Sequence, residues 1–597
     1  MKSRTCSFVV AAIFFTAVAT PVQLAAQELT QQDSKNHNHY KLIDMGTFGG
    51  PQSYVFAPLS FANVLNNNGT LAGFADTSTP DPFPNFCFND CFVNHAFQWQ
   101  HGEMTDLGAL PDGSSSASTF IGGGGLIAGL SQNGKVDPLF PGFPESRAVL
   151  WNRGKIRNLG TLEGGYESAA SAVNSQGQVV GASLNTVPDS NAMILLGIFP
   201  PIPYQVRPFL WERGVMQDLG TLPGGTDAQA VLINDAGQVA GWSYNGSAPS
   251  AVCAALGFPL TTGSFLWDRN NGMVDLGNLG GTCTAAADLN SRGQVAGISY
   301  LTGDTFQHAF MWDGSMHDLG DSFGGNYSGA IAINDHGQVV GFAFYPGDVT
   351  FHAALWKHVG ETTDLGTVGK DGCSFSNAIN VKMQVVGTSI STCGSENSPT
   401  RAFLWEDSSI FDLNTLIQPG SALYLQNAYV INDQAEIAGQ GVDSSGNQHA
   451  FLLIPCDENH LDVEGCDYSL VDASAATRES PVVMQEPTTT APRTLRPSGR
   501  RGSSLRHFGA RTGTLPIVQN GSTADEDGIG NHSAPDADLL LGTVTWTPPL
   551  LQETLGTLSG TRVAGRCVTR GGQCPPWTKC CPGLICVPAS TRAFCEP

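Results

Sequence analysis

Residues 333–341 read INDHGQVVG, and this string decides the fold because it returns along most of the chain. Each copy has an apolar residue, Asn, a short polar turn, an apolar pair and a final Gly. Further copies are LNNNGTLAG (65–73), VNSQGQVVG (173–181), INDAGQVAG (233–241) and LNSRGQVAG (289–297). INVKMQVVG (379–387) and INDQAEIAG (431–439) are weaker, and FIGGGGLIAG (120–129) is degenerate. From Asn66 to Asn432 the copies are about 52 residues apart, which indicates a repeat architecture.

Two further strings recur with the same period. The second signature is an aromatic segment that usually ends in Trp: HAFQW (95–99), RAVLW (147–151), RPFLW (207–211), GSFLW (263–267), HAFMW (308–312), HAALW (352–356), RAFLW (401–405) and HAFLL (449–453). The third is Asp-Leu-Gly or a variant of it, beginning at Asp44, Asp106, Asn158, Asp218, Asp275, Asp318, Asp364 and Asp412. Each signature occurs eight times, so one repeat holds all three.

Each repeat reads as two β-hairpins. The small residues before the Asn form one strand, and the Asn-x-x-Gly turn, with Gly at positive φ, leads into the Gln-Val-Val strand. The aromatic strand then turns through polar residues and Gly into the Asp-Leu-Gly strand. Four-stranded units with this period are typical of propeller blades. The sequence predicts an all-β, closed β-propeller of eight four-stranded blades, or of seven if the degenerate copy near Gly122 is an insertion.

The signatures are offset at the two ends of the repeat region. A lone third signature at residues 40–50 precedes the first repeat, and the last repeat, at 431–454, lacks one. An N-terminal strand that serves as the outer strand of the last blade supplies the missing signature and removes exposed sheet edges. We therefore expect residues 40–50 to pair with the last blade.

Composition and the N-terminus limit the function classes. The chain has 52 acidic and 29 basic residues, which opposes nucleic acid as a partner because phosphates need basic side chains. Lys2, Arg4 and the apolar residues 7–19 form a secretory signal within residues 1–26. No later stretch is long and apolar enough for a membrane span. We expect a secreted, extracellular monomer, with the periplasm or the cell surface as alternatives.

The cysteines agree with export. Apart from Cys6 in the signal, they form local groups of even number, which exported proteins use for disulfides. The predicted pairs within and just after the repeats are Cys87–Cys91, Cys253–Cys283, Cys373–Cys393 and Cys456–Cys466. Cys87 and Cys91 could instead hold a metal, but no further Cys stands near them, and His95, the nearest His, belongs to the second signature. We predict no metal site and no cofactor.

Two parts of the chain resemble known families. The HAFLW, Asp-Leu-Gly and INDxGQVVG strings of residues 40–454 resemble the HAF-repeat family of extracellular bacterial proteins, which implies export and a repeat fold but no established activity. The C-x6-C-x5-C-C-x4-C-x8-C spacing near the C-terminus resembles inhibitor cystine knots (knottins). That resemblance implies the pairs Cys567–Cys581, Cys574–Cys586 and Cys580–Cys595; spacing alone leaves the connectivity open.

The predicted domains follow from these boundaries. A signal peptide covers residues 1–26, the propeller 40–455, a basic low-complexity linker 456–560, and the knottin-like module 561–597. The linker is rich in Ser, Thr, Pro and Arg, a composition typical of disorder.

The residue that opens the second signature is His or Arg in most repeats. Hairpin geometry places it diagonal to the first residue of the third signature, and such charge pairs contribute about 0.2–1 kcal/mol each. A shared metal ring is excluded because Arg is not a practical ligand. The predicted structural pairs are His95–Asp106, Arg147–Asn158, Arg207–Asp218, His308–Asp318, His352–Asp364, Arg401–Asp412 and, across the closure, His449–Asp44.

Loop lengths predict a ligand face. The recurrent Asn is interpreted as a turn residue, and the Trp of the second signature as packing between blades. Connections between the first and second signatures are long in the first four repeats (74–94, 130–146, 182–206 and 242–262) and short in the last four. Insertions on one face usually mark the binding side of a repeat protein. Aromatic residues in these segments form the predicted ligand face: Phe83, Phe86, Phe140, Phe143, Phe199, Tyr204 and Trp242.

Catalytic motifs do not stand out. The sequence has no clear Gly-x-Ser-x-Gly elbow or His-Glu-x-x-His helix, and no catalytic residue is predicted. We expect a secreted binding or scaffold protein whose partner is an extracellular protein or a glycan. The alternatives are a propeller glycosidase or polysaccharide lyase, which would need paired carboxylates, and a structural cell-surface protein.

Overall fold

The computed structural model describes residues 39–55, 63–83, 91–138, 143–193, 203–320, 322–395, 398–457, 459–460, 463–464 and 466, and three short strands at 573–574, 585–588 and 593–596. The predicted signal peptide and nearly all of the predicted linker lie outside the described residues.

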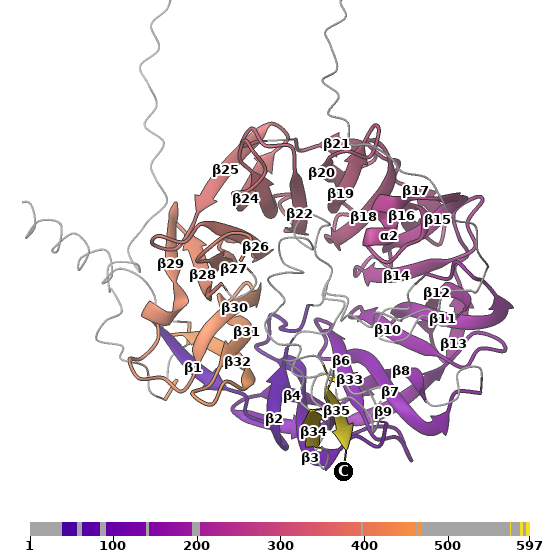
Figure 1. The fold of residues 1–597 in the computed structure, drawn as a ribbon, viewed down its shortest axis with the longest axis horizontal. Helices are drawn as coiled ribbons and strands as arrows, with labels where there is room; N and C mark the ends of the chain where they lie inside the picture. The colour runs from indigo at the N-terminus through magenta and orange to yellow at the C-terminus, as the bar shows by residue number, and fades with distance from the viewer. Residues whose placement is uncertain are drawn as a thin grey trace, which may run out of the picture. The chain divides into compact units, whose positions relative to one another are not determined.

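The described chain is nearly all β-strand, arranged as four-stranded antiparallel units around a common centre, which is the architecture of a β-propeller (Figure 1). The first four units are β2 (Gly49–Tyr54), β3 (Leu71–Pro80), β4 (Phe92–Gln100) and β5 (Glu103–Asp106); β6 (Ser116–Ile121), β7 (Ile127–Val136), β8 (Pro144–Asn152) and β9 (Lys155–Gly160); β10 (Ser168–Val173), β11 (Val179–Pro188), β12 (Tyr204–Glu212) and β13 (Val215–Asp218); and β14 (Ala228–Ile233), β15 (Val239–Pro249), β16 (Leu260–Asp268) and β17 (Gly272–Asp275).

The second half of the propeller continues in the same order. Its units are β18 (Gly280–Leu289), β19 (Val295–Leu301), β20 (Gln307–Trp312) and β21 (Met316–Asp318); β22 (Ser328–Ile333), β23 (Val339–Phe344), β24 (Phe351–His358) and β25 (Glu361–Gly366); β26 (Cys373–Ile379), β27 (Val385–Ile390), β28 (Thr400–Glu406) and β29 (Ser409–Asp412); and β30 (Tyr424–Ile431), β31 (Ile437–Val442), β32 (Gln448–Pro455) and β1 (Tyr40–Asp44). Within the described residues, the helical segments are α2 (Ala251–Ala255) and η2 (Leu413–Thr415).

The degenerate copy near Gly122 forms a unit of its own, because β6, β7, β8 and β9 pair in that order. The β14–β17 and β18–β21 units are joined into one sheet by a single parallel bridge between Thr262 and Cys283. Within the described residues, no backbone ladder joins any other pair of units. Side chains therefore hold most neighbouring units together.

The N-terminal strand completes the last unit. β1 pairs antiparallel with β32, from Tyr40 opposite Pro455 to Asp44 opposite Phe451. The pairing covers only the first half of residues 40–50, because Gly49 and Gly50 already belong to β2 in the next unit. The chain therefore leaves the last unit and enters the first within a few residues.

The final Gly of the first signature permits close packing inside each unit. In β11, Gly181 lies opposite Phe209 of β12, and a Cβ at Gly181 would stand 2.0 Å from Ala169 O and 2.9 Å from the Phe209 ring. The aromatic ring thus lies on the strand where a side chain would otherwise stand. This contact explains why Gly in the first signature accompanies an aromatic residue in the second.

Serine side chains link five of the inner strands to the preceding unit. The Oγ atom of Ser168, in β10, accepts from Ala148 N at 2.9 Å and donates to Gly160 O at 2.6 Å, both in the β6–β9 unit. Ser116, Ser328 and Ser374 make the same two contacts with their preceding units. Ser53, in β2, accepts from Ala450 N of β32 at 3.1 Å, which joins the last unit to the first.

The antiparallel order places the connections at two opposite ends of the propeller. The Asn-x-x-Gly turns and the turns after each Trp share one end, which we call the turn end. The connections between the second and third strands share the other end with the crossings between units, and we call it the crossover end. Figure 1 shows β10, β14 and β22 among the strands nearest the centre, and the residues that end the innermost strands at the turn end line the space there.

The C-terminal region contributes a small separate sheet. β33 (Gln573–Cys574), β35 (Ala593–Glu596) and β34 (Ile585–Pro588) pair in that order, with Cys586 opposite Cys595. Cys567, Cys580 and Cys581 lie outside the described residues, so the implied knottin pairing stays a prediction. Among the helices of the described chain, none is long and apolar enough to cross a membrane.

Candidate functional site

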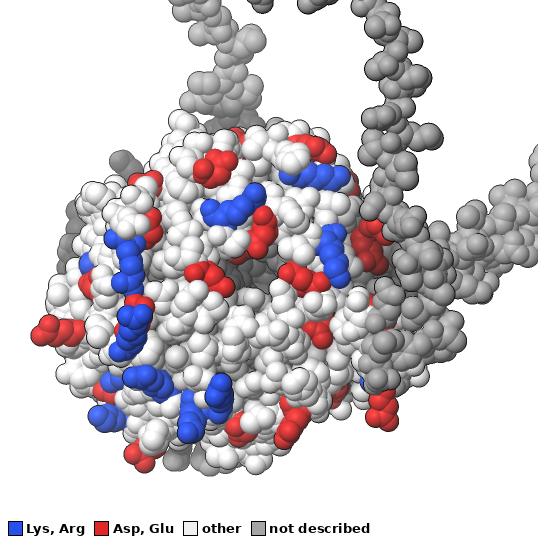
Figure 2. Space-filling view, turned by 180° about the vertical axis from the view of Figure 1, so that it is seen from behind, with Lys and Arg blue, Asp and Glu red and all other residues white. Residues whose placement is uncertain are grey.

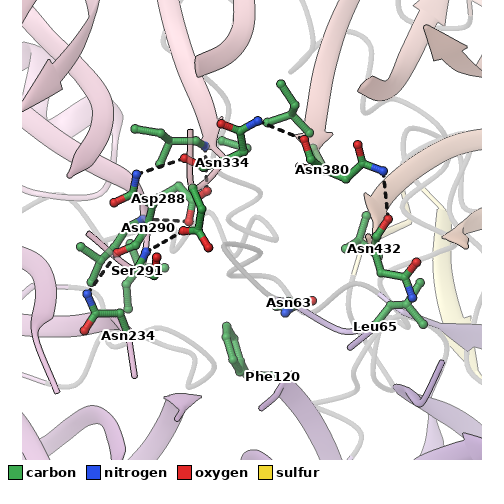
Figure 3. Close-up of a pocket in the computed structure, with 18 of the residues that line it drawn as sticks. Asn63, Leu65, Phe120, Asn234, Asp288, Asn290, Ser291, Asn334, Asn380 and Asn432 are labelled. Carbon is green, nitrogen blue, oxygen red and sulfur yellow. Dashed lines mark hydrogen bonds between the residues drawn. The ribbon is translucent and has the colours of Figure 1, made fainter. Parts of the chain in front are cut away.

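The recurrent Asn side chains form a ring of hydrogen bonds at the turn end (Figure 3). In Asn290, Oδ1 accepts from the N–H groups of Arg292 and Gln294 and so closes its own turn. Its Nδ2 donates to Asn334 O in the next repeat at 3.0 Å. The same lateral bond runs from Asn174 to Asn234 O, Asn234 to Asn290 O, Asn334 to Asn380 O, Asn380 to Asn432 O, Asn432 to Asn66 O and Asn66 to Gly122 O.

This lateral role was not foreseen from the sequence, which identified the Asn only as a turn residue. The degenerate repeat interrupts the ring, because Gly122 has no side chain with which to reach Asn174. Gly122 instead packs closely against the next repeat: a Cβ there would lie 2.9 Å from Val173 O. A different bond replaces the missing one, since Thr119 Oγ1 donates to Ala170 O at 2.8 Å.

Aspartates that follow the Asn add a second set of bonds between repeats. Asp235 Oδ1 accepts from Ser175 N at 2.9 Å, and Asp335 Oδ1 accepts from Ser291 N at 2.9 Å. Asp433 Oδ1 accepts from Val381 N at 3.1 Å. These aspartates were absent from the predicted site. The recurrence of Ile-Asn-Asp at 233–235, 333–335 and 431–433 was the signal that could have identified them.

The ring surrounds a central pocket with a volume of about 430 Å³. Its wall combines apolar residues at the ends of the inner strands, including Phe120, Val173 and Ile333, with the polar side chains of the recurrent Asn and Asp residues. The carboxylates that line it are Asp235, Asp288, Asp335 and Asp433, and no Lys or Arg of the described chain lines it. Figure 2 shows a hollow at the centre of one side of the molecule, with acidic side chains around it and most basic ones further out.

Asp288 differs electrostatically from an ordinary surface carboxylate. Burial raises its pKa to about 6, against the lowering effect of hydrogen bonds from the N–H groups of Ile333 and Leu289, while the charge of Asp335 raises it further. The Ile333 N–H bond is 2.8 Å long and the Leu289 N–H bond is 2.8 Å long, one to each carboxylate oxygen. Asp288 therefore ties β18 to β22, since both of its oxygens serve the backbone.

The structure brings the predicted His–Asp partners together at the crossover end. The His Nδ1 atom lies 2.9 Å from the Asp carboxylate in His95–Asp106, His308–Asp318 and His449–Asp44, and 3.0 Å from it in His352–Asp364. Each of these aspartates also accepts a hydrogen bond from the Gly N–H two residues later, as in Gly108 to Asp106 at 2.7 Å. The Asp-Leu-Gly string is thus both a turn and a charge partner.

The Asp106 carboxyl illustrates the electrostatics of these pairs. Partial burial raises its pKa, but the hydrogen bonds from His95 and Gly108 outweigh burial, so the pKa is lowered overall. In the pair between the last and the N-terminal strands, the hydrogen bond that His449 donates to Asp44 raises the pKa of His449 against the effect of burial. Both effects favour the charged forms, as expected of structural ion pairs.

The predicted arginine pairs differ more in their distances and partners. Arg207 Nε lies 3.0 Å from Asp218. Arg401 stands closer to Asp371, at 3.1 Å, than to Asp412, at 3.8 Å.

The structure does not bring Arg147 to Asn158. Its guanidinium contacts Glu145 at 2.8 Å and donates to Tyr166 O, while Asn158 Oδ1 accepts from Gly160 N. A neutral amide cannot compete with a nearby carboxylate for a guanidinium, which accounts for the wrong pairing.

The predicted ligand face is corrected at Trp242. Its side chain is 1% exposed, Nε1 donates to Ala286 O at 2.9 Å, and the ring packs on Phe258 with centroids 5.1 Å apart. The prediction failed because β15 continues to Pro249, which puts Trp242 inside a paired strand and not in a loop. Phe83, Phe143 and Tyr204 are half-buried, and Phe86, Phe140 and Phe199 lie outside the described residues.

The fourth long connection is also packed. α2 carries Cys253, which forms a disulfide with Cys283 of the following unit, and Phe258 beyond it is 2% exposed. Disulfides also join Cys373 to Cys393 and Cys456 to Cys466. Cys91 is disulfide-bonded, and Cys87, its predicted partner, lies outside the described residues. No group of three or more metal-ligating side chains occurs in the described part of the chain.

Comparison with known proteins gives no family. No family model matches the chain, and no curated protein matches it. Solved structures that resemble it include an acylaminoacyl peptidase from Pyrococcus horikoshii (10% identity, TM-score 0.35, covering 68% of this chain and 58% of that one). The β-propeller domain of the Trilobed protease from Pyrococcus furiosus also matches (10% identity, TM-score 0.35, 63% of this chain and 98% of that one).

A polysaccharide lyase that acts on ulvan resembles it less (11% identity, TM-score 0.25, 57% of this chain and 83% of that one). These similarities are too low to carry an argument about function.

Proposed function

We propose that this chain is a secreted binding protein, built on a closed ring of eight blades, that holds its ligand in the central pocket at the turn end. The observation that carries the proposal is the Asn ring, because it fixes the rim of a pocket of about 430 Å³. A pocket of this volume suits a small ligand or one side chain of a larger one.

Four features support eight blades and closure. Asn432 Nδ2 donates to Asn66 O across 366 residues of sequence, and Ser53 Oγ accepts from Ala450 N. β1 pairs with β32 along its whole length. The degenerate repeat has its own four strands, which supports a blade at this position over an insertion.

The charge of the rim selects the ligand. Four carboxylates and no described Lys or Arg line the pocket, so its potential attracts a cationic group and repels an anionic one. The pocket replaces the long loops as the proposed binding surface. Among the four long connections only the fourth is described throughout, and its residues 250–259 are held by a disulfide and pack on Trp242. A scaffold role remains compatible with the packed crossover end.

The glycosidase or lyase alternative has one observation in its favour. Asp288 lines the pocket with a pKa of about 6, and Asp335 is a second carboxylate beside it. A general acid must deliver its proton to a substrate, however, and both oxygens of Asp288 accept backbone N–H groups. Binding is therefore the better supported function. Turnover of a polysaccharide that Asp288→Asn abolishes would favour the enzyme instead.

The binding proposal is tested with a matched pair of small molecules. Calorimetric titration compares 1,4-diaminobutane, a dication, with 1,4-butanediol, which is neutral and similar in shape. We expect the diamine to bind and the diol not to, and we expect the double variant Asp235→Asn/Asp335→Asn to weaken diamine binding about 10-fold or more at low salt. Asparagine keeps the Oδ1 acceptor for Ser175 and Ser291, so the rim keeps its shape.

Asp407→Asn is the control for removal of a carboxylate elsewhere on the surface, because Asp407 is an exposed turn residue outside the pocket. This variant should bind the diamine like the original chain. Equal binding of diamine and diol, or diamine binding that the double variant leaves unchanged, would contradict the proposal.

A further inference from the structure

Among the seven repeats whose second signature ends in Trp, this Trp is partly exposed in one. Trp99, Trp151, Trp211, Trp267, Trp356 and Trp405 are at most 6% exposed. Trp312, at the end of β20, is partly exposed. Trp312 packs against the core cluster that contains Leu266 and Tyr300. Its strand position is thus the same as that of the other Trp residues, and the difference lies in what covers its ring.

Another repeat shows what can cover this Trp. The Arg157 guanidinium lies over the Trp211 ring, 4.8 Å from its centroid, and reaches it from the preceding unit. In the pairing of β8 with β9, Arg157 stands opposite Leu150 of the second signature. Val274 stands opposite Leu266 in the pairing of β16 with β17, which is the same register position in the unit that precedes Trp312. Val274 is 40% exposed, and its short apolar side chain has no charged group to place over Trp312.

A groove of about 260 Å³ lies at this position, at the turn end between the β14–β17 and β18–β21 units. Val274 and Trp312 line it, and two carboxylates, Asp268 and Asp313, border it. Hydrogen bonds from Asn271 and Asn270 lower the pKa of Asp268, which is therefore ionised at neutral pH. Asp313 Oδ1 lies 2.8 Å from His317 Nε2.

One basic residue also lines the groove. Arg292 Nη2 donates to Gln294 Oε1 at 2.6 Å, which draws the guanidinium toward its own turn. Two carboxylates against one guanidinium leave the groove with a net negative charge. An aromatic ring together with carboxylates favours a planar cation over a neutral or anionic group.

We propose that this groove binds an arginine side chain of a partner protein. The guanidinium of the partner takes the place that Arg157 occupies over Trp211, and it faces Trp312 with Asp268 and Asp313 at its edge. The groove is a second site, distinct from the central pocket, because none of the residues that line it also lines that pocket.

The first experiment is a fluorine NMR titration of the chain labelled with 5-fluorotryptophan. The probe is N-acetyl-arginine methylamide, and its neutral counterpart is the same derivative of citrulline. The resonance of residue 312 is assigned by its loss in Trp312→Phe. We expect the arginine derivative to shift this resonance with a Kd of about 1–10 mM, as for a weak single-residue contact, and citrulline to leave it in place.

The second experiment fills the groove from within. Val274→Arg places a guanidinium where Arg157 lies in the other repeat, so we expect binding of the arginine derivative to fall about 10-fold or more and residue 312 to be shifted without ligand. Gln217→Arg is the matched control, because Gln217 holds the same register position opposite Leu210, and the Trp267 ring that follows it is 6% exposed. This control should bind like the original chain.

Two results would overturn the inference. One is binding that Val274→Arg does not change. The other is a shift of residue 312 by citrulline, or by methyl glucoside and not by arginine, which would make the groove a site for neutral polar ligands or saccharides. The Asp235→Asn/Asp335→Asn variant separates the two proposals, since it should lose diamine binding in the central pocket and keep the arginine-induced shift.

Discussion

Replacement of Asn432 by Ala tests the ring at the point where the last repeat meets the first. The Asn432 side chain is 4% exposed and makes four hydrogen bonds. Nδ2 donates to Asn66 O at 3.0 Å and to Glu436 Oε2 at 2.6 Å, while Oδ1 accepts from Gln434 N at 3.0 Å and Glu436 N at 2.9 Å. Alanine removes all four and leaves buried backbone groups without these partners.

The expected loss follows from the cost of unmade bonds. A net hydrogen bond contributes about 0.5–1.5 kcal/mol, and a buried partner left unsatisfied costs about 1–3 kcal/mol. Water can reach part of the turn, so we expect Asn432→Ala to lower the free energy of unfolding by about 2–4 kcal/mol. Asn290→Ala is the comparator, because Asn290 makes the same four kinds of bond inside the ring, between Asn334 and its own turn.

Urea unfolding followed by circular dichroism measures the stability, and hydrogen exchange measures where the chain opens. The two variants should lose similar free energy, but only Asn432→Ala should speed exchange in β1 and β2, since its lateral bond joins the two ends of the propeller. A loss below about 0.5 kcal/mol in both variants would refute the assigned role of the ring. Faster exchange in β1 and β2 in both variants would refute the special role of Asn432 in closure.

Three further predictions follow. His449→Gln should destabilise the chain below about pH 6.5, and the loss of stability should shrink as the pH rises through the folded pKa of His449. The reason is that a raised His pKa contributes stability that is present below the unfolded pKa and lost above the folded pKa. Melting temperatures of both chains across pH 5.5–8.5 test this, and a pH-independent difference would contradict it. Ser168→Ala should cost about 1–3 kcal/mol in urea unfolding, because its Oγ makes two hydrogen bonds to the preceding unit. Ser264→Ala should be neutral or stabilising, because the buried Ser264 Oγ has no hydrogen-bond partner among the described residues. Equal losses in the two variants would show that the Ser168 contacts contribute nothing. Cys253→Ala/Cys283→Ala should cost about 3–4 kcal/mol from the 30-residue separation that the disulfide closes, and an unchanged melting temperature would argue against that disulfide.

The sequence by itself determined the strand content and the order of the strands. Recurrent turn residues and apolar strings are local signals, since a turn needs Asn and Gly at fixed positions whatever surrounds it. The offset of the third signature likewise placed the N-terminal strand beside the last repeat, where β1 pairs with β32. Diagonal partners such as His308 and Asp318 follow from the register of a short hairpin, which is also local.

Only the tertiary structure decided what each repeated residue does toward its neighbours. The sequence around Asn290 does not reveal whether its side-chain amide bonds only within its own turn or also donates to Asn334 O, because that acceptor belongs to another repeat. Trp242 reads as a loop aromatic until β15 is seen to continue past it. Trp211 is covered by Arg157 of its preceding unit, whereas the unit that precedes Trp312 has Val274 at the same register position. Contacts between repeats depend on radial packing, and a one-dimensional period carries no record of that packing.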